Sequence, residues 1–251
     1  TSVTGYFKAY FEDVELDNDI GYDDPVYGEG RRVEACRVLE DVSTLINIHT
    51  TTITPDIIFN RTDIIIPALA GASPYFIPGY DNGSMHSHII TEADPTPQVG
   101  LFDASILTNF NVTWSSDTPL SPGVYDFYTV LTHEIMHTLG FMSRLPVVIS
   151  QTNVPQTHNT FDSFIYKDVT LAEKFINTVT GFLNVPIGAP SSWFITNDVV
   201  YQGVQNTLNA TPNGIRPIYS PANWQQGSSL SHFDPSRAPG EAYIMRPSTP
   251  T

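Results

Sequence analysis

Basic residues are scarce in this chain of 251 residues: 11 Lys and Arg stand against 26 Asp and Glu, and the formal net charge at pH 7 is −15. A surface of this charge repels nucleic-acid phosphates and anionic lipid headgroups, so we expect neither as a partner. Long apolar runs are absent as well. No window approaches the length of about 18 consecutive apolar residues that a membrane-spanning helix needs, so we predict no membrane span.

Cysteine is nearly absent too. The single Cys36 excludes an intramolecular disulfide, and its apolar neighbours favour a buried, unreactive thiol. A hydrophobic content of 41% and an aromatic content of 12% are typical of a globular chain. The chain starts at Thr1 without a charged and apolar leader, so in a secreted protein a signal peptide would already have been removed.

The most informative stretch runs from Asp126 to Phe141 and contains the sequence His133-Glu134-Ile135-Met136-His137. On an α-helix, side chains four residues apart lie on one face, one turn above each other, so both imidazoles can bind one ion. The glutamate lies beside them and can take a proton from a water molecule that the metal polarises. This pattern predicts a zinc site with Glu134 as general base.

Both ends of this stretch favour a helix. Asp126 is a good N-cap after the turn residues 121–123, and Gly140 is a good C-cap. Apolar residues between them give the helix a face to bury: Val130, Leu131, Ile135 and Leu139. The alternative is an ordinary packed helix with hydrogen-bonded histidines, but an accidental match to the motif is expected in only about 0.7% of chains of this composition.

Two histidines leave a zinc site incomplete, because catalytic sites usually have three protein ligands and an open position. In the compact metzincin pattern the third histidine would stand at position 143, where this chain has Ser143. Serine is not a credible zinc ligand, so the third ligand has to come from elsewhere. Three candidates follow: Glu173 on a helix predicted over Leu171–Phe182, His158 in a loop without supporting pattern, and His232.

A methionine turn is indicated after His232 by the sequence Met245-Arg246-Pro247. With the motif above and a long insertion before the distal histidine, the chain resembles the leishmanolysin-like branch of the metzincin zinc peptidases. The resemblance implies that Gly140 is the glycine kept after the second histidine. It also implies that His232 is the third zinc ligand and that Met245 lies in a Met-turn beneath the metal.

This resemblance covers the second half of the chain well and the first hundred residues only by the order of elements. It extends to Thr160–Phe164 and Tyr219–Asp234. There are two departures. Leishmanolysin is rich in disulfides, whereas this chain has one cysteine, so the inserted lobe must be held by packing or metal. Pro247 stands where some metzincins have a tyrosine, so we assign no tyrosine to the transition state.

The predicted fold class is α+β, a metzincin-like, two-lobed zinc peptidase. Alternating or β-branched stretches favour strands over 6–16, 57–69, 84–91 and 101–112, and helical spacing favours a helix over 31–48. We expect an N-terminal mixed sheet with two helices, including the zinc helix, and an irregular C-terminal lobe with a helix and a Met-turn. The boundary falls just after Gly140, which gives subdomains over residues 1–141 and 142–251 of one catalytic domain.

Three weaker signals concern other sites. The acidic stretch 17–25 predicts a solvated turn, with a Ca²⁺ site as the alternative, because Gly21 and Gly28 break the EF-hand spacing. His86 and His88 could hold a second metal, although ordinary core or exposed histidines are favoured, and their edge strand could pair with a peptide. Asp234 is either an acceptor for an imidazole N–H or a solvent-facing turn residue.

Motif and resemblance together predict a secreted, monomeric zinc-dependent endopeptidase with Zn²⁺ as its cofactor and a protein or peptide as its substrate. Its site residues would be His133, His137 and His232 as metal ligands, Glu134 as the catalytic base, and Met245 as support. Two other classes stay open. A zinc-dependent hydrolase of a non-peptide ester or amide would use the same site, and a binding or adhesion module could keep the metal for structure.

Overall fold

The computed structural model describes residues 2–12, 20–46, 54–62, 68–76, 102–115, 120–145, 158–180, 182–184, 198–202, 215–223, 225, 227–237 and 244–247. The chain divides into two compact units, one ending at Gly140 and one spanning Phe141–Ser248. Within the described ranges, both α-helices belong to the first unit, and each unit contains its own sheet. The fold is therefore α+β, as predicted.

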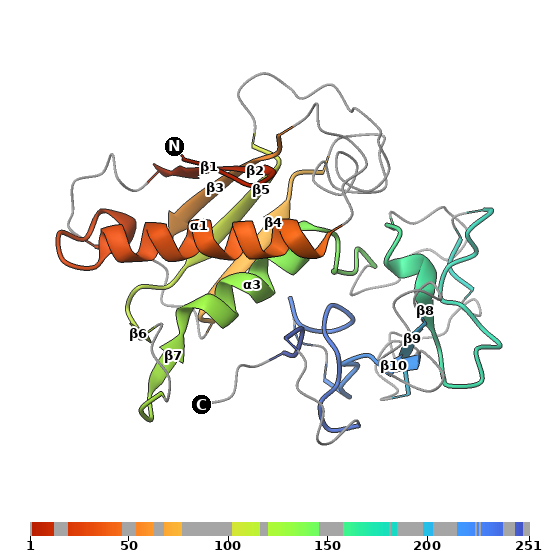
Figure 1. The fold of residues 1–251 in the computed structure, drawn as a ribbon. Coiled ribbons are helices and arrows are strands. Elements are labelled where there is room, and N and C mark those ends of the chain that lie inside the picture. Colours follow the sequence, from red (N-terminus) through yellow and green to blue (C-terminus); the bar gives the residue numbers. More distant parts are fainter. Residues whose placement is uncertain are drawn as a thin grey trace. The chain divides into compact units, whose positions relative to one another are not determined.

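The first unit is built on a five-stranded mixed sheet (Figure 1). The spatial order of its strands is β1 (Ser2–Thr4), β2 (Phe7–Phe11), β3 (Asp56–Arg61), β5 (Ala104–Thr108) and β4 (Ala70–Pro74). The three central strands are parallel, with Ala9 opposite Ile57 and Ile57 opposite Ala104, whereas β1 and β4 run antiparallel at the two edges. Parallel pairing needs covered faces, which the two helices supply on one side.

Two helices, α1 (Gly28–Leu45) and α3 (Phe127–Thr138), pack on one face of this sheet (Figure 1). The buried sheet residues alternate along their strands, so they point to the same side. They form one core with buried residues of both helices: Phe7, Ala9, Ile57, Phe59, Ala104 and Ile106 from the sheet, Ala35, Val38, Leu39 and Val42 from α1, and Phe127, Leu131 and Ile135 from α3. This shared core fixes α3 against the sheet.

The second unit has a three-stranded antiparallel sheet in the order β10 (Ile215–Pro217), β9 (Val200–Gln202) and β8 (Ile165–Tyr166). Its core is separate from that of the first unit and includes Phe161, Ile165, Phe175, Ile176, Val199, Ile218 and Leu230. A short 3₁₀ turn, η3 (Asp162–Phe164), precedes β8. The lobe is thus a small, loop-rich structure with its own packed interior.

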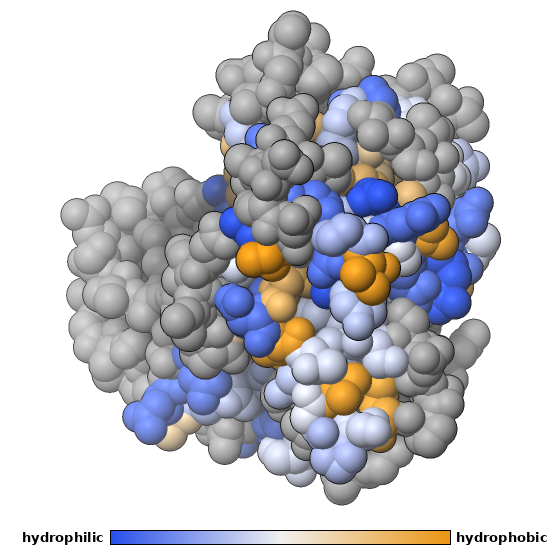
Figure 2. All heavy atoms as spheres, turned by 90° about the vertical axis from the view of Figure 1, so that its left-hand side faces the viewer, coloured by the Kyte–Doolittle hydropathy of each residue, from blue (hydrophilic) through white to orange (hydrophobic). Residues whose placement is uncertain are grey.

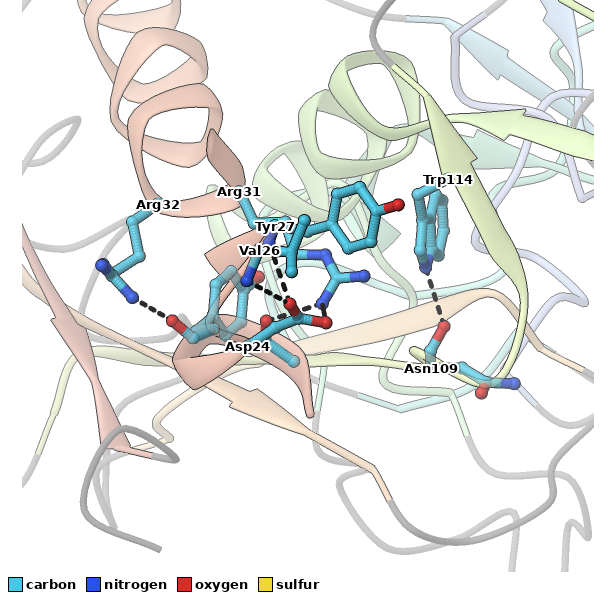
Figure 3. Close-up of polar contacts among 9 residues, drawn as sticks. Asp24, Val26, Tyr27, Arg31, Arg32, Asn109 and Trp114 are labelled. Atoms are coloured by element: carbon cyan, nitrogen blue, oxygen red, sulfur yellow. Dashed lines mark hydrogen bonds and ion pairs between the residues drawn. The ribbon is translucent and has the colours of Figure 1, made fainter. Parts of the chain in front are cut away.

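Asp24, in the acidic stretch 17–25, holds the turn that leads into α1 (Figure 3). The Asp24 carboxylate accepts hydrogen bonds from the backbone N–H groups of Val26 (2.8 Å) and Tyr27 (2.9 Å) and lies 3.5 Å from the Arg31 guanidinium. Asp24 therefore stabilises the turn that leads into α1. Residues 17–19 of that stretch lie outside the described residues, so the calcium alternative stays untested.

Close approach of the chain explains a glycine at the first residue of α1. A Cβ atom at Gly28 would lie 2.6 Å from the carbonyl oxygen of Tyr22. That carbonyl also accepts a hydrogen bond from the Arg32 guanidinium (Figure 3). The Tyr22 side chain is fully buried. The short 3₁₀ turn η2 (Gly21–Asp23) can pack this tightly against α1 only where the helix lacks a side chain.

A second, two-stranded sheet leads into α3. It consists of the parallel strands β6 (Thr113–Ser115) and β7 (Val124–Asp126). The Trp114 indole N–H on β6 donates to the carbonyl oxygen of Asn109 at 2.9 Å, which anchors this strand to the end of β5 (Figure 3). Strand β6 lies beyond the strand predicted over 101–112 and was not predicted from the sequence.

Most predicted elements of the first unit are confirmed: the described strands are shorter than predicted, and the helix begins and ends three residues earlier. The helix expected over 31–48 is α1, and strands predicted over 6–16, 57–69 and 101–112 are β2, β3 and β5. The edge strand β4 was not predicted, because Ala70-Gly71-Ala72-Ser73-Pro74 has little intrinsic strand preference; it forms by pairing with β5. The strand predicted over 84–91 lies outside the described residues.

The helix predicted over Leu171–Phe182 does not form in the residues described there. Ile176 pairs antiparallel with Leu183, and Asn177 N–H donates to the Phe182 carbonyl. The Asn177 side chain accepts from the N–H groups of Val179 (3.0 Å) and Thr180 (3.1 Å), which makes a turn. The helix prediction failed because this turn and the β-branched residues around it outweigh the apolar spacing.

Apolar side chains are scattered over the face that Figure 2 presents, separated by polar ones rather than gathered in one patch. The described residues nonetheless include several exposed apolar side chains of the first unit: Val26, Tyr27, Val33 and Leu45. In the part of the chain that the structure describes, no helix has both the length and the apolar character needed to cross a membrane.

Replacing Gly28 by Ala should destabilise the protein by about 2 kcal/mol, because the added methyl group would overlap the Tyr22 carbonyl. Gly30 lies two residues on in the same helix, and a Cβ there meets no atom within 4 Å. Gly30→Ala is thus the matched control and should stabilise by about 0.5–1 kcal/mol through its higher helix propensity. Urea unfolding of both variants checks this; equal effects would contradict the close-packing explanation.

Candidate metal centre

The two histidines of the motif converge on α3. Their Nε2 atoms lie 3.1 Å apart, and the two rings are nearly perpendicular. Two nitrogens bound to one tetrahedral zinc at about 2.0–2.1 Å would be separated by about 3.3 Å, so the observed spacing suits a shared ion. His137 is buried, whereas His133 is partly exposed. The pair therefore presents two nitrogens to one point from a single helix turn.

The helix ends hold this pair in place as the sequence predicted. At the N-terminus, the Asp126 carboxylate accepts from the Tyr128 N–H at 3.2 Å and from the Thr129 hydroxyl. At the C-terminus, Gly140 adopts a φ of +107° and its N–H donates to the carbonyl of His137 at 3.0 Å. A glycine tolerates this left-handed conformation without steric cost, so the chain leaves α3 immediately after the second histidine.

The Glu134 carboxyl is buried in surroundings that disfavour its charged form. Its side chain is 5% exposed, and its Oε2 atom is buried without a hydrogen-bond partner. Burial raises the pKa of this carboxyl from its ordinary value of 4.5 to about 8. A buried carboxyl oxygen without a partner is expensive to maintain, and such groups are concentrated at functional sites.

His232 is held by the backbone of the second unit. Its Nδ1 lies 2.9 Å from the Ser228 carbonyl oxygen, so that nitrogen carries the proton and donates it, which leaves Nε2 as the unprotonated nitrogen that could bind a metal. Its own carbonyl accepts from the Tyr219 N–H at 2.8 Å. Two residues earlier, Leu230 is fully buried and adopts a φ of +63°, a left-handed conformation that costs about 1–2 kcal/mol outside glycine.

Met245 is tied to the same segment. Its carbonyl accepts a hydrogen bond of 2.7 Å from the N–H of Phe233, the residue after His232, and its side chain is 3% exposed. Thirteen residues separate the histidine and the methionine in the sequence, yet this bond joins their segments directly. The turn over 244–247 and the distal histidine therefore form one local structure.

His133, His137 and His232 form the group that could hold a metal ion within the described part of the chain, each offering one ring nitrogen, all within 4.8 Å of one another. The chemistry of this donor set fits zinc, which favours imidazole nitrogens in catalytic sites with an open fourth position. A buried, unpaired carboxyl oxygen next to the histidine pair adds the base that such a site requires.

The other candidate ligands lie in different surroundings. Glu173 has an exposed side chain 3.3 Å from the Lys167 ammonium, and the helix predicted to carry it does not form. His158 lies beside Asp162 and lowers the pKa of that carboxyl. Neither belongs to the histidine group. His86 and His88 lie outside the described residues.

The interpretation of Asp234 as a solvent-facing residue was wrong, whereas a role as an acceptor for an imidazole N–H stays a prediction. The Asp234 side chain is buried rather than solvent-facing, and it accepts from the N–H and the hydroxyl of Ser236 at 2.9 and 2.6 Å. The acceptor that fixes His232 is the Ser228 carbonyl. Sequence reasoning missed this partner because a backbone carbonyl is present at every residue and leaves no signature in the sequence.

Comparison with models of known families, with curated proteins and with solved structures gave no match. The resemblance to the leishmanolysin-like metzincins therefore remains a prediction from the motif residues.

The metal-free protein should lose about 3–4 kcal/mol of unfolding free energy between pH 5 and pH 8 through Glu134 alone. With a pKa of about 8, the folded state keeps the proton, whereas the unfolded state releases it near pH 4.5. Stability is therefore present below the unfolded pKa and lost as the pH rises to 8. Glu134→Gln is neutral throughout and should lack this loss.

Urea unfolding of chelator-treated wild type and Glu134→Gln at several pH values checks this prediction. Glu173→Gln serves as the control, because it makes the same chemical change at an exposed side chain outside the histidine group. Parallel stability curves for the wild type and Glu134→Gln would contradict the raised pKa of Glu134.

Proposed function

We propose that the protein is a zinc-dependent endopeptidase that hydrolyses peptide bonds with Glu134 as general base. The observation that carries this proposal is the polar edge of α3, where two Nε2 atoms lie 3.1 Å apart and the Glu134 carboxyl between them in sequence has a buried, unpaired oxygen. A purely structural helix would gain stability by replacing that carboxyl with an apolar residue. The arrangement is instead suited to binding a cation and moving a proton.

Three imidazoles would hold the ion. His133 and His137 contribute Nε2 from one helix face, and His232 contributes Nε2 because its Nδ1 proton is donated to the Ser228 carbonyl. When bound, zinc supplies a Lewis acid that polarises the scissile carbonyl and makes water more acidic. Met245 supports the third ligand through the hydrogen bond between its carbonyl and Phe233.

Glu134 would move the proton. Burial raises the pKa of this carboxyl in the metal-free protein, so it holds a proton more readily than an exposed glutamate does. Its burial keeps bulk water away from the unpaired oxygen. In the reaction it would take the proton of the attacking water and pass it to the leaving amine.

A peptide as substrate and an extracellular location follow from the family resemblance and belong to the same proposal. The strongly acidic composition, with 26 Asp and Glu, favours basic or neutral substrates over acidic ones through the field of the whole protein.

Glu134→Gln should abolish peptide hydrolysis, with a loss of at least about 100-fold in kcat, while one zinc per chain is retained. His232→Ala should lower both zinc content and hydrolysis, because it removes a ligand. Metal analysis by mass spectrometry and cleavage of a peptide library, run on the same samples, measure both quantities. Glu173→Gln and His158→Ala are the matched controls at the rival ligand positions and should behave as the wild type.

Four outcomes would contradict the proposal in different ways. Full activity in Glu134→Gln would show that Glu134 is not the general base. Full zinc content in His232→Ala would show that His232 is not the third ligand. A zinc-loaded wild type that cleaves ester or amide substrates but no peptide would indicate a hydrolase of another class. Bound zinc without hydrolysis of any substrate would indicate a binding module.

A further inference from the structure

The buried carboxylate of Asp162 binds the segment that opens the second unit. Asp162 is fully buried, and its carboxylate accepts three hydrogen bonds: from the Ser143 hydroxyl (2.6 Å) and from the N–H groups of Arg144 (3.1 Å) and Asn159 (3.0 Å). The Asn159 side chain accepts from the Asp162 N–H and donates to the Met142 carbonyl at 2.7 Å. Together the two side chains bind three consecutive residues, 142–144.

Ser143 extends this network to the segment of the distal histidine. Its backbone N–H donates at 3.0 Å to the hydroxyl of Ser231, which is buried and directly precedes His232. The two serines lie 88 positions apart in the sequence, and all four side chains of the network belong to the second unit. Ser143 itself follows His137 by only six residues in the chain.

We propose that Asp162, Asn159, Ser143 and Ser231 form a positioning clamp for the third metal ligand, joining the chain that leaves the metal helix to the residue before His232. Asp162 is its central positioning residue and touches no reacting atom. The proposal rests on the proposed function, since it assigns a role to residues around the same site. Ser143 stands where the compact metzincin pattern has its third histidine. In this chain the residue at that position would not bind the metal but would hold the segment of His232 in place.

A side chain that only filled space at position 162 would not need a carboxylate. Burial raises the pKa of the Asp162 carboxyl to about 6, against the opposing effect of its three hydrogen-bond donors, so keeping a carboxyl here costs stability near neutral pH. Both oxygens of the carboxylate are used, Oδ1 by Ser143 and Oδ2 by the two N–H groups. Only a side chain with two acceptor atoms in one plane, or an amide that accepts with one atom and donates with the other, fits these partners.

The test compares metal affinity in variants of the whole chain, by competition with a chromophoric chelator for Zn²⁺. Asp162→Ala should lower Zn²⁺ affinity about 10–100-fold, and Ser143→Ala about 10-fold, as expected for residues that orient a ligand. Asp162→Asn should stay within about threefold of the wild type, because its amide oxygen can accept from both N–H groups and its NH₂ can donate to Ser143. The absorption spectrum of the Co²⁺-loaded protein should change in Asp162→Ala and not in Asp162→Asn.

Ile176→Ala is the control for lost stability. Ile176 is fully buried in the core of the same unit and belongs to none of these hydrogen bonds, so this variant should melt at a lower temperature yet bind Zn²⁺ within about threefold of the wild type. Unchanged affinity and an unchanged Co²⁺ spectrum in Asp162→Ala and Ser143→Ala would overturn the clamp, as would an affinity loss in Ile176→Ala equal to theirs.

The two proposals fail in distinguishable ways. A wild type that binds Zn²⁺ but cleaves no peptide overturns the proposed function, while the affinities of the variants still decide for or against the clamp. A wild type that binds neither Zn²⁺ nor Co²⁺ overturns both.

Discussion

The desolvated carboxyl of Glu134, on the same helix turn as two imidazoles 3.1 Å apart, is the constraint on which the rest of the first unit depends. Holding that group away from water costs several kcal/mol, and nothing in its own hydrogen bonding offsets this for Oε2. The compensation has to come from packing. On the side of α3 opposite the two imidazoles, Leu131 and Ile135 are completely buried against α1 and the sheet, and each contributes about 1.5–3 kcal/mol. The apolar half of the helix therefore stabilises its polar half.

How far the sequence predicted this structure depends on whether the signal was local. The metal helix was predictable because its cap at Asp126, its glycine at 140 and its apolar spacing all agree, and α1 because its buried residues follow one helical stripe. Strand β4 was not, because its small residues form a strand only through pairing with β5. The stretch around Asn177 has helical spacing as well, yet a side-chain turn and burial of both Phe175 and Ile176 keep the chain extended.

The same distinction between local and non-local signals applies to the residues of the candidate metal site. His133, Glu134 and His137 follow from one motif, because a helix alone brings residues four apart together. His232 followed from resemblance and not from spacing, since no local rule relates it to the helix. What orients it is a carbonyl at Ser228 and a left-handed backbone at Leu230, and neither has a signature in residue type. The buried network around Asp162 was invisible for a related reason: its members are ordinary Ser, Asn and Asp residues, far apart in sequence.

A long insertion between two metal ligands need not weaken metal binding, provided that the two ends of the insertion are held in place. The entropic cost of closing a flexible loop grows only logarithmically with length, so doubling the stretch between Ser143 and Ser231 would add about 0.6 kcal/mol. Ligand geometry is far less tolerant, because it must hold to a fraction of an ångström. With the single Cys36, no intrachain disulfide can supply that precision. The hydrogen bonds at the base of the insertion can, since they act on Ser143 and Ser231 themselves. The network includes Asn159 and Asp162 but none of the residues between Asp162 and Ser231.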